Sequence, residues 1–336
     1  MTFPFSYFIF FFFLIMGTVI SISSPSWFGV WVGLELNLMS FIPLISLKMN
    51  SYFSEAALKY FLIQAMGSAL LISSSFLFIS LTSISLSLIL FSLLLKMGSA
   101  PFHFWFPQVM EGILWPQVFL LSTIQKVAPL TLISYLMVSE MLSKLTILTA
   151  ISSAVIGALG GLNLMLLRKI IAFSSINHLS WMLIAVSMSD TFWLFYFLIY
   201  SLILLSITSM FFSLQTYTLP SLIKSNQNSS FFPLLISFNF LSLSGLPPFT
   251  GFVPKWMLIQ IMLNQKLFLP IFFLLFSALI TLYFYLRIII PFILIIGPKM
   301  SFNKKFKSFT LSTPSVIIKT LFNFLGLFLP IYSLLL

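Results

Sequence analysis

The chain consists of long apolar segments separated by short polar connections. About 20 apolar residues are needed to cross the hydrocarbon core of a bilayer, and by that measure the segments predict eleven helices. The predicted helices cover residues 4–23, 26–46, 56–81, 84–100, 116–139, 144–165, 170–188, 191–216, 233–262, 268–296 and 314–335. No alternating pattern of a membrane β-barrel is present. The pattern therefore predicts an all-α polytopic membrane protein.

The composition agrees with a membrane protein. Of the 336 residues, 60% are hydrophobic and 6% are charged, whereas soluble domains carry about 25% charged residues. The absence of Cys excludes disulfides, thiolate metal sites and cysteine nucleophiles. The first apolar segment has no basic region before it and no small-residue cleavage site, so we interpret it as a membrane helix and not as a signal peptide.

The formal net charge of +11 comes mostly from basic residues in the short connections between the predicted membrane helices. If the helices alternate in direction, the connections after even-numbered helices share the side of the N-terminus. These connections carry Lys48, Arg168, Lys169, Lys224, Lys299, Lys304, Lys305 and Lys307. The opposite side has Lys144 and Lys266, offset by Glu140 and Asp190. The positive-inside rule then places the N-terminus in the cytoplasm or its organellar equivalent, and we expect no nucleic-acid partner.

Two interruptions of the apolar segments share a sequence pattern. GSAPFHFWFP at 98–107 and GLPPFTGFVP at 245–254 both read G-x-x-P-F-x-x-x-x-P, and they break the fourth and ninth helices. Helices 1–5 and 6–10 would form two repeats, over residues 4–139 and 144–296. Each repeat has an odd number of helices, so the second would be inverted. Together with a C-terminal helix over 314–335, they would make one transmembrane domain. Inverted repeats with paired broken helices are typical of ion-coupled transporters, although Gly and Pro also simply kink packed helices.

Ionisable side chains lie well inside the predicted helices or at their breaks. They are Glu35, Lys96, Lys126, His178 and Lys255. A charged side chain at the centre of a membrane helix costs about 2.5–3.5 kcal/mol on insertion scales, so such residues indicate a function. An amine in a low-dielectric setting binds its proton less tightly and can therefore release it. The broken helices leave backbone groups without partners in the helix, and water can hydrate these groups. The set therefore predicts a buried proton path.

A structural interpretation stays open for most of these residues. Lys96 and Lys255 flank helix breaks and could extend towards an interface. Glu35 and Lys96 could form a static ion pair that only locks the helices together. His178 could be a neutral, hydrogen-bonded packing residue.

Other charged residues and motifs add little chemistry. Glu55 and Lys59 are four residues apart at the start of a helix and predict an interfacial ion pair. The sequence contains no CxxC, HExxH, P-loop or GxGxxG motif, and its five acidic residues are too few for a carboxylate-rich metal centre. We expect no redox or hydrolytic chemistry within this chain.

Six segments carry a resemblance to a known family. They are WVGLELNLMSFIPLIS, SEAALKYFLIQA, LLLKMGSAPFHFWFPQVMEG, QKVAPL, LRKIIAFSSINHLSWM and SLSGLPPFTGFVPKW. In this order, across residues 27–256, they resemble NADH dehydrogenase subunit 2 of mitochondrial respiratory complex I. The chain is similar to the animal form, which lacks three N-terminal helices of bacterial relatives. Segments 217–231 and 297–313 carry no family signal.

The resemblance implies an antiporter-like fold and a role for each buried charge. It implies that Glu35 on the second helix pairs with Lys96 on the first broken helix. It also implies that Lys126 links two half-channels and that Lys255, at the second break, serves the opposite half-channel. His178 matches a polar position on the central axis.

The resemblance also implies a cellular setting. The chain would lie in the membrane arm of complex I, beside other antiporter-like and small membrane subunits, in the mitochondrial inner membrane. Its N-terminus would face the matrix and its C-terminus the intermembrane space. NADH, flavin, iron–sulfur clusters and ubiquinone would belong to other subunits, and no cofactor or metal is expected in this chain.

Two alternatives to a proton-translocating subunit remain. A stand-alone cation/proton antiporter of related fold is one, but Na⁺ coordination needs several oxygen ligands and Glu35 is the single mid-membrane carboxylate of the predicted spans. A non-pumping scaffold subunit of the same complex is the other, in which the buried charges would be structural.

Overall fold

A computed structural model describes residues 5–46, 50–78, 80–137, 139–225 and 231–294. All the regular elements in these ranges are helices, and the single β-bridge described there joins Leu166 and Thr218. By length and composition, eight of the described helical segments could cross a membrane. This confirms an all-α polytopic membrane protein. The count of eleven helices is not confirmed, since the predicted helix over 314–335 lies outside the described residues.

The described residues of the first half of the chain form seven helical segments. They are α1 (Phe5–Ser23), α2 (Trp27–Ile45), α3 (Ser51–Leu77), α4 (Thr82–Met97), α5 (Trp105–Gly112), α6 (Trp115–Ser122) and α7 (Ile124–Leu136). The second half forms α8 (Glu140–Gly160), α9 (Leu167–Met188), α10 (Asp190–Leu214), α11 (Leu219–Ser225), α12 (Phe231–Ser244), α13 (Phe252–Asn264) and α14 (Phe268–Leu294).

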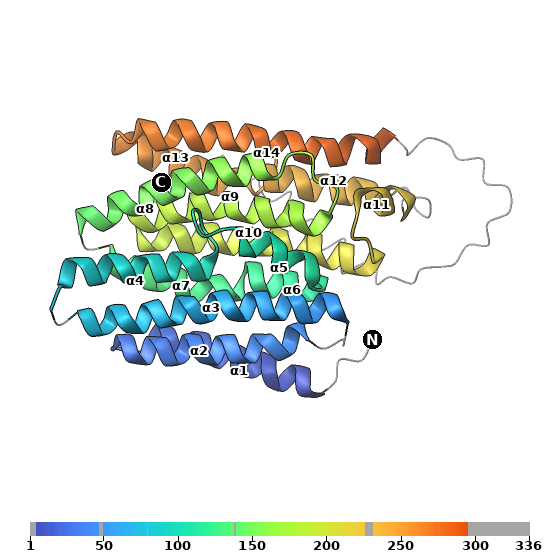
Figure 1. Cartoon of the computed structure of the whole chain (residues 1–336). Helices are drawn as coiled ribbons and strands as arrows, with labels where there is room; N and C mark the ends of the chain where they lie inside the picture. Colours follow the sequence, from blue (N-terminus) through green and yellow to red (C-terminus); the bar gives the residue numbers. More distant parts are fainter. Residues whose placement is uncertain (1–4, 47–49, 79, 138, 226–230, 295–336) are drawn as a thin grey trace, which may run out of the picture.

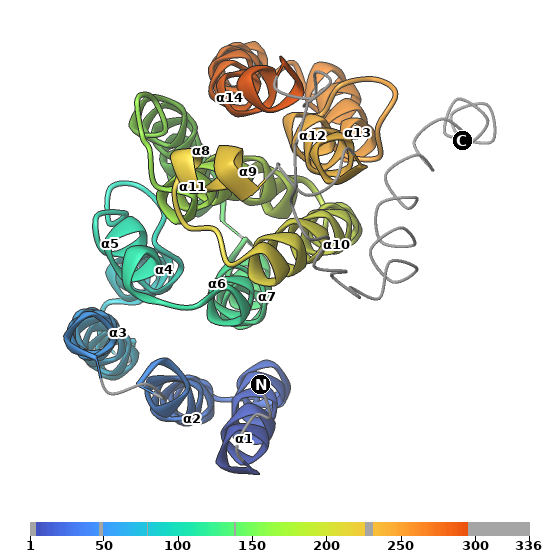
Figure 2. The same ribbon diagram turned by 90° about the vertical axis from the view of Figure 1, so that its right-hand side faces the viewer.

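The long helices lie side by side with their axes close to parallel (Figure 1). Seen from one end, α1, α2 and α3 occupy one edge of the bundle and α12, α13 and α14 the opposite edge (Figure 2). α9 lies between them and contacts α5, α6, α7, α8, α10, α13 and α14. Nearly all its side chains are buried, so α9 is the core of the molecule.

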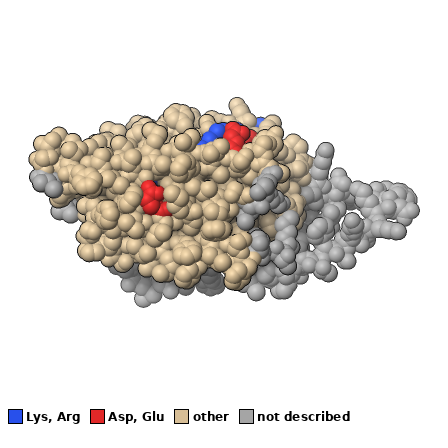
Figure 3. Space-filling model, turned by 60° about the horizontal axis from the view of Figure 1, so that its bottom comes forward, with Lys and Arg blue, Asp and Glu red and all other residues tan. Residues whose placement is uncertain are grey.

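The outer helices present apolar side chains outward. Phe5, Phe8 and Phe12 of α1 and Phe272 of α14 are each more than half exposed. Uncharged side chains cover almost all of the face in Figure 3, and its few charged side chains form small patches. A surface of this kind suits a lipid environment, where apolar groups need no burial inside the protein.

Both Gly/Pro interruptions break a helix, as the sequence predicts. α4 ends at Met97 because Gly98 takes a left-handed conformation (φ 72°), and its N–H bonds the carbonyls of Leu94 and Leu95. The ninth predicted helix likewise divides into α12 and α13, with Gly245 at φ 80° after the end of α12. Glycine adopts this conformation without the steric cost that a Cβ would bring.

Two local predictions differ from the structure. The helix expected over 116–139 is interrupted at Thr123, whose backbone (φ −120°, ψ −82°) leaves the helical region between α6 and α7. The hydroxyl of Thr123 donates to the carbonyl of Phe119 (2.6 Å), a bond that bends helices. The connection expected over 217–231 contains the short helix α11.

Small residues let two helix pairs approach closely. In the α1/α2 pair, a Cβ at Gly17 would lie 2.9 Å from the backbone nitrogen of Asn37. In the α8/α9 pair, a Cβ at Gly157 would lie 2.7 Å from the backbone nitrogen of Asn177. In each pair, therefore, a glycine of one helix packs against the backbone of an asparagine on the other helix.

Candidate functional site

Lys96 lies in the last turn of α4 and is buried, with 7% of its surface exposed. Gly67 of α3 leaves room for its stem, since a Cβ there would lie 3.1 Å from Cγ of Lys96. The end of α4 is held by two side chains from neighbouring helices. Gln64 Nε2 donates to the carbonyl of Lys96 (3.1 Å), and Trp105 Nε1 donates to the carbonyl of Leu95 (3.1 Å).

Glu35 lies half-buried on α2. None of the ion pairs found among the described residues joins it to Lys96. Its charge nevertheless acts electrostatically on Lys96 and on the hydroxyl of Tyr60. The pairing of Glu35 with Lys96 that the family resemblance implies stays a prediction.

A chain of polar side chains connects α2, α3 and α7 beside Glu35. The Tyr60 hydroxyl of α3 donates to Oε1 of Gln125 (3.2 Å), and Gln125 Nε2 donates to Oδ1 of Asn37 (2.9 Å). Asn37 lies two residues after Glu35, and Gln125 immediately precedes Lys126. These hydrogen bonds therefore join the helices that carry Glu35 and Lys126, without reaching either charged group.

Lys126 lies in the first turn of α7, just after the break at Thr123. It is almost completely buried, with 1% of its surface exposed. Its ammonium nitrogen lies 4.8 Å from the centre of the Phe106 ring and has no hydrogen-bond partner among the described residues. A buried amine without a partner is costly when charged, so this position favours exchange of a proton over a fixed charge.

His178 lies near the middle of α9, between the two halves of the molecule. Its Nδ1 is 2.9 Å from the hydroxyl of Tyr196, and its ring centre is 5.0 Å from that of Tyr200. Both Lys126 and Lys255 act on His178 electrostatically. The imidazole therefore lies within the electrostatic influence of both lysines.

Lys255 lies in the first turn of α13, directly after the second break. Its ammonium group donates to the carbonyl of Ser244 at the end of α12 (2.8 Å) and lies 5.7 Å from the Trp181 ring centre. The partner is a carbonyl freed by the break at Gly245. Lys96 thus lies just before the first break and Lys255 just after the second.

Sequence reasoning missed the polar side chains that surround the charges. They are Asn37, Gln64, Gln125, Tyr196 and Tyr200. Asn37, Gln64 and Gln125 are amides within otherwise apolar helical segments, and that signal was present in the sequence. The two tyrosines give no such signal, because a tyrosine in a membrane helix is also an ordinary packing residue.

The described residues bring together no group of three or more His, Cys, Asp or Glu side chains that could hold a metal ion. The polar atoms of the site are amines, amides, hydroxyls, one imidazole and one carboxylate. All of these can donate or accept a hydrogen bond, and the carboxylate, imidazole and amines can each take up or release a proton. The arrangement suits movement of protons along the bundle.

Comparisons with known proteins identify the family of the chain. The family model "NADH:quinone oxidoreductase/Mrp antiporter, TM" matches residues 24–87 and 79–281. The chain is 44% identical over 336 residues to "NADH-ubiquinone oxidoreductase chain 2" of Anopheles gambiae. The aligned region covers 95% of this chain and 94% of that protein. It is 45% identical over 288 residues to the Aedes aegypti protein of the same name, with 83% of each chain covered.

A solved structure shows the same fold at lower identity. A chain in "Respiratory complex I from Thermus thermophilus with bound Aureothin" superimposes with a TM-score of 0.82 at 22% identity, over 98% of this chain and 79% of that one. At this identity the likeness concerns the fold alone. The family model and the relatives extend the agreement to the sequence: the chain belongs to the NADH-ubiquinone oxidoreductase chain 2 family of antiporter-like membrane proteins.

Proposed function

We propose that Glu35, Lys96, Lys126, His178 and Lys255 form a proton path through the bundle. The chain acts as a proton-translocating subunit in the membrane arm of NADH:ubiquinone oxidoreductase, as the name of its relatives suggests. Electron transfer takes place in other subunits and drives the movement of protons here. In this proposal the two broken helices supply Lys96 and Lys255, and Lys126 and His178 connect them.

One observation carries the proposal: no ion pair among the described residues joins Lys96, Lys126 or Lys255 to a carboxylate. The ion pairs found among the described residues are Lys59–Glu55, Lys144–Glu140 and Lys169–Glu111, all outside the path. Lys126 faces an aromatic ring and Lys255 faces a backbone carbonyl. A buried charge kept only for structure is expected to be paired, because the desolvation cost is otherwise uncompensated. Weakly held amines can change protonation during a cycle.

The proposed setting is the mitochondrial inner membrane, beside other antiporter-like and small membrane subunits. The animal relatives and the apolar outer surface support this setting. The proposed orientation has the N-terminus in the matrix and the C-terminus in the intermembrane space, and its support is the uneven distribution of basic residues. A stand-alone antiporter is less well supported, because relatives that cover most of the chain carry the name of a respiratory-complex subunit.

The test is Lys96→Met in membranes that contain the assembled complex. We expect assembly on native gels to persist while proton pumping and NADH:quinone electron transfer fall together. Lys144→Met is the matched control, since Lys144 pairs only with Glu140 and its side chain is 71% exposed. A scaffold role predicts instead that both activities persist in Lys96→Met, because removal of an unneeded buried charge is neutral or stabilising.

A further inference from the structure

Arg168 lies in the first turn of α9 and contacts both halves of the molecule. Its Nη1 donates to the carbonyl of Ile113 (2.6 Å), the residue that follows α5. Its guanidinium lies 4.7 Å from the centre of the Tyr217 ring, in the segment that follows α10. Arginine can make both contacts at once, because the edge of its planar fork donates hydrogen bonds while its face stacks on a ring. A lysine would keep the charge without this geometry.

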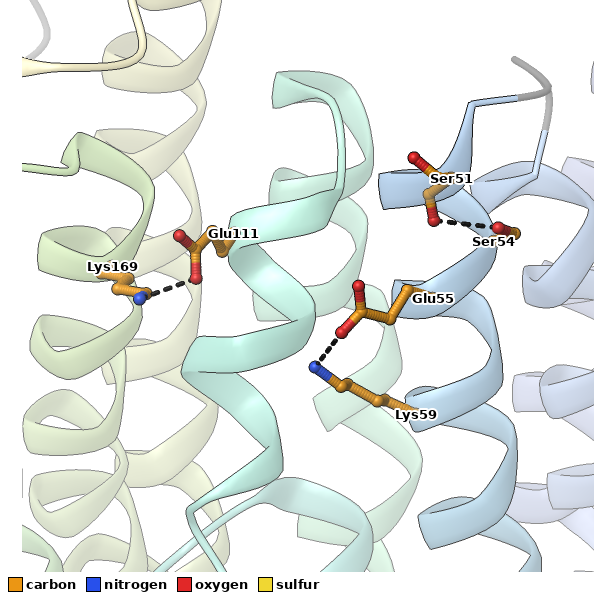
Figure 4. Close-up of polar contacts among 6 residues, drawn as sticks. All are labelled: Ser51, Ser54, Glu55, Lys59, Glu111 and Lys169. Carbon is orange, nitrogen blue, oxygen red and sulfur yellow. Dashed lines mark hydrogen bonds and ion pairs between the residues drawn. The ribbon is translucent and has the colours of Figure 1, made fainter.

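The carbonyl that Arg168 holds lies at the end of a short helix. α5 has eight residues, and the last carbonyls of any helix lack partners within it. A basic side chain can take the place of those partners. Lys169, next to Arg168, adds an ion pair with Glu111 in the last turn of α5 (2.7 Å; Figure 4). The end of α5 is therefore tied to the start of α9 at two points.

The same end of α5 also packs tightly on α3. A Cβ at Gly112 would lie 2.6 Å from Cβ of Ala56 and 2.9 Å from the carbonyl oxygen of Tyr52. Figure 4 shows α5 between α9 and α3. With close packing on α3 and polar contacts to α9, the end of α5 is fixed in place.

Tyr217, the second contact of Arg168, is itself fixed to the bundle. Its carbonyl accepts from the backbone N–H of Leu167 (3.0 Å). Its ring stacks on that of Trp115 at the start of α6, with ring centres 6.0 Å apart and planes at 10°. Trp115 is completely buried, and its Nε1 donates to the carbonyl of Thr216 (3.1 Å). The guanidinium therefore rests on a rigid base.

The other end of α5 carries two rings of the candidate site. Trp105 Nε1 donates to the carbonyl of Leu95 in the last turn of α4. The Phe106 ring centre lies 4.8 Å from the ammonium nitrogen of Lys126. Phe106 and Gly112 are about 9 Å apart along the helix axis. A helix this short moves nearly as one body, so a shift of the end that Arg168 holds reaches both rings.

We infer that Arg168 is a positioning residue of the proton path. It holds the end of α5 against the Tyr217 ring and so keeps the Phe106 ring beside Lys126. The same contact keeps Trp105 against the end of α4. The inference rests on the proposed function and adds to it a residue that itself takes up no proton. A basic residue in this connection also serves topology by its charge alone, and that role would be met equally well by lysine.

The first test is Arg168→Lys in the assembled complex, with turnover measured per assembled complex. The charge stays, whereas the fork and its stacking on Tyr217 are lost. We expect turnover to fall at least about threefold with the amount of assembled complex unchanged, because a small misplacement of a group in the path slows transfer. Lys169→Arg is the matched control: it keeps the neighbouring charge and can still pair with Glu111. It should behave as the unmodified chain. A normal turnover in Arg168→Lys would overturn the inference.

A second pair of variants covers the case in which Arg168→Lys fails to assemble. Tyr217→Phe keeps the ring beneath the guanidinium, and Tyr217→Leu removes it. We expect normal turnover in Tyr217→Phe and a loss in Tyr217→Leu that resembles the loss in Arg168→Lys. The losses should not add in the double variant, since both changes act on one contact. Equal turnover of Tyr217→Leu and Tyr217→Phe would overturn the inference.

A rescue experiment separates positioning from any other role of Arg168. Glu111→Cys and Lys169→Cys are introduced together, with and without Arg168→Lys, into a chain that has no Cys of its own. A short bifunctional methanethiosulfonate then joins α5 to α9 at the site of the native ion pair. We expect the cross-link to restore most of the turnover that Arg168→Lys loses. The same reagent on Arg168→Lys alone controls for cysteines of other subunits. Turnover that stays low after cross-linking would overturn the inference.

Failure of this inference is distinguishable from failure of the proposed function. An unchanged Arg168→Lys beside an inactive Lys96→Met overturns the inference alone. An active Lys96→Met in the assembled complex rejects the proposed function and the inference with it, whatever the turnover of Arg168→Lys.

Discussion

The ammonium nitrogen of Lys126 lies 4.8 Å from the centre of the Phe106 ring, on the short helix that follows the first break. Gly98, at that break, is in close contact with Phe106, since a Cβ at Gly98 would lie 3.0 Å from Cβ of Phe106. The break that follows Lys96 therefore also positions the ring that faces the central lysine. A ring holds a cation by about 0.5–2 kcal/mol and leaves a lysine able to release its proton.

Lys126→Met should leave the complex assembled and abolish most of its coupled turnover. The substitution removes an amine whose charged form costs about 2.5–3.5 kcal/mol at mid-membrane, so thermal stability should be equal or higher. Loss of a group that transfers protons should lower pumping at least about tenfold. Native gels check assembly, and proton uptake measured together with NADH oxidation checks coupling. A normal pumping rate in the assembled variant would remove Lys126 from the path.

Tyr196→Phe should impair the path through His178. The hydroxyl of Tyr196 lies 2.9 Å from Nδ1 of His178, and this contact orients the ring and selects which nitrogen carries its proton. We expect a few-fold loss of turnover with assembly intact, because one hydrogen bond contributes about 0.5–1.5 kcal/mol. The loss should not add to that of His178→Gln, since both changes act on one group. Tyr283→Phe, at an exposed tyrosine of α14, is the control and should behave as the unmodified chain.

The parts of this site that follow from local sequence were predictable. Gly and Pro in both G-x-x-P-F segments marked the two breaks, because a Gly followed closely by Pro weakens the helical hydrogen-bond ladder. Glu55 and Lys59, four residues apart on one helix, form the expected ion pair at 2.6 Å. The buried lysines were found because a charge within an apolar span is unusual in any membrane helix.

The parts that depend on packing between helices were not predictable. The break at Thr123 has no Gly or Pro, and it depends on a hydroxyl bond to Phe119 that a threonine makes in some helices and not in others. The relation of Glu35 to Lys96 depends on how α2 packs beside α3 and α4. The family resemblance implies a pair, and that pair stays a prediction. The hydrogen bonds that join Tyr60, Gln125 and Asn37 beside Glu35 depend on the same packing and were not predicted.

Gly245→Ala should destabilise the second break and disturb Lys255. Gly245 has φ 80°, where a residue with a Cβ is strained by about 1–2 kcal/mol. The new Cβ would also lie 2.9 Å from Cδ and 3.1 Å from Nζ of Lys255. We expect a lower melting temperature of the assembled complex and a lower turnover.

Gly98→Ala provides the comparison for this prediction. Gly98 has a similar φ of 72°, but its neighbours are Phe106 and Trp105. Both variants should lose stability. A melting temperature and a turnover unchanged in Gly245→Ala would show that the second break tolerates a side chain and that Lys255 does not depend on its position there.

The two-repeat architecture remains a prediction. The close contacts between helices at Gly17 and Gly157 supply a test of it. A Cβ at Gly17 would lie 2.9 Å from backbone atoms of Asn37 and Gly33, and one at Gly157 would lie 2.7 Å from Asn177. The two glycines occupy corresponding positions if α1/α2 and α8/α9 are equivalent pairs. The two contacts then support the repeat, and a Gly→Ala substitution should have the same effect in both halves.

Gly17→Ala and Gly157→Ala should each separate a helix pair and lower stability by about 1–3 kcal/mol, since a methyl group cannot be placed against backbone without movement. Val19→Ala and Leu148→Ala, on the outer surfaces of the same helices, are the matched controls and should leave stability unchanged. Thermal melting of the assembled complex measures all four. Equal losses for the two glycines support equivalent pairs. A loss at Gly157 with none at Gly17 would instead mean that α1/α2 packs loosely at the edge of the bundle, and that the two halves differ in the contact on which the repeat depends.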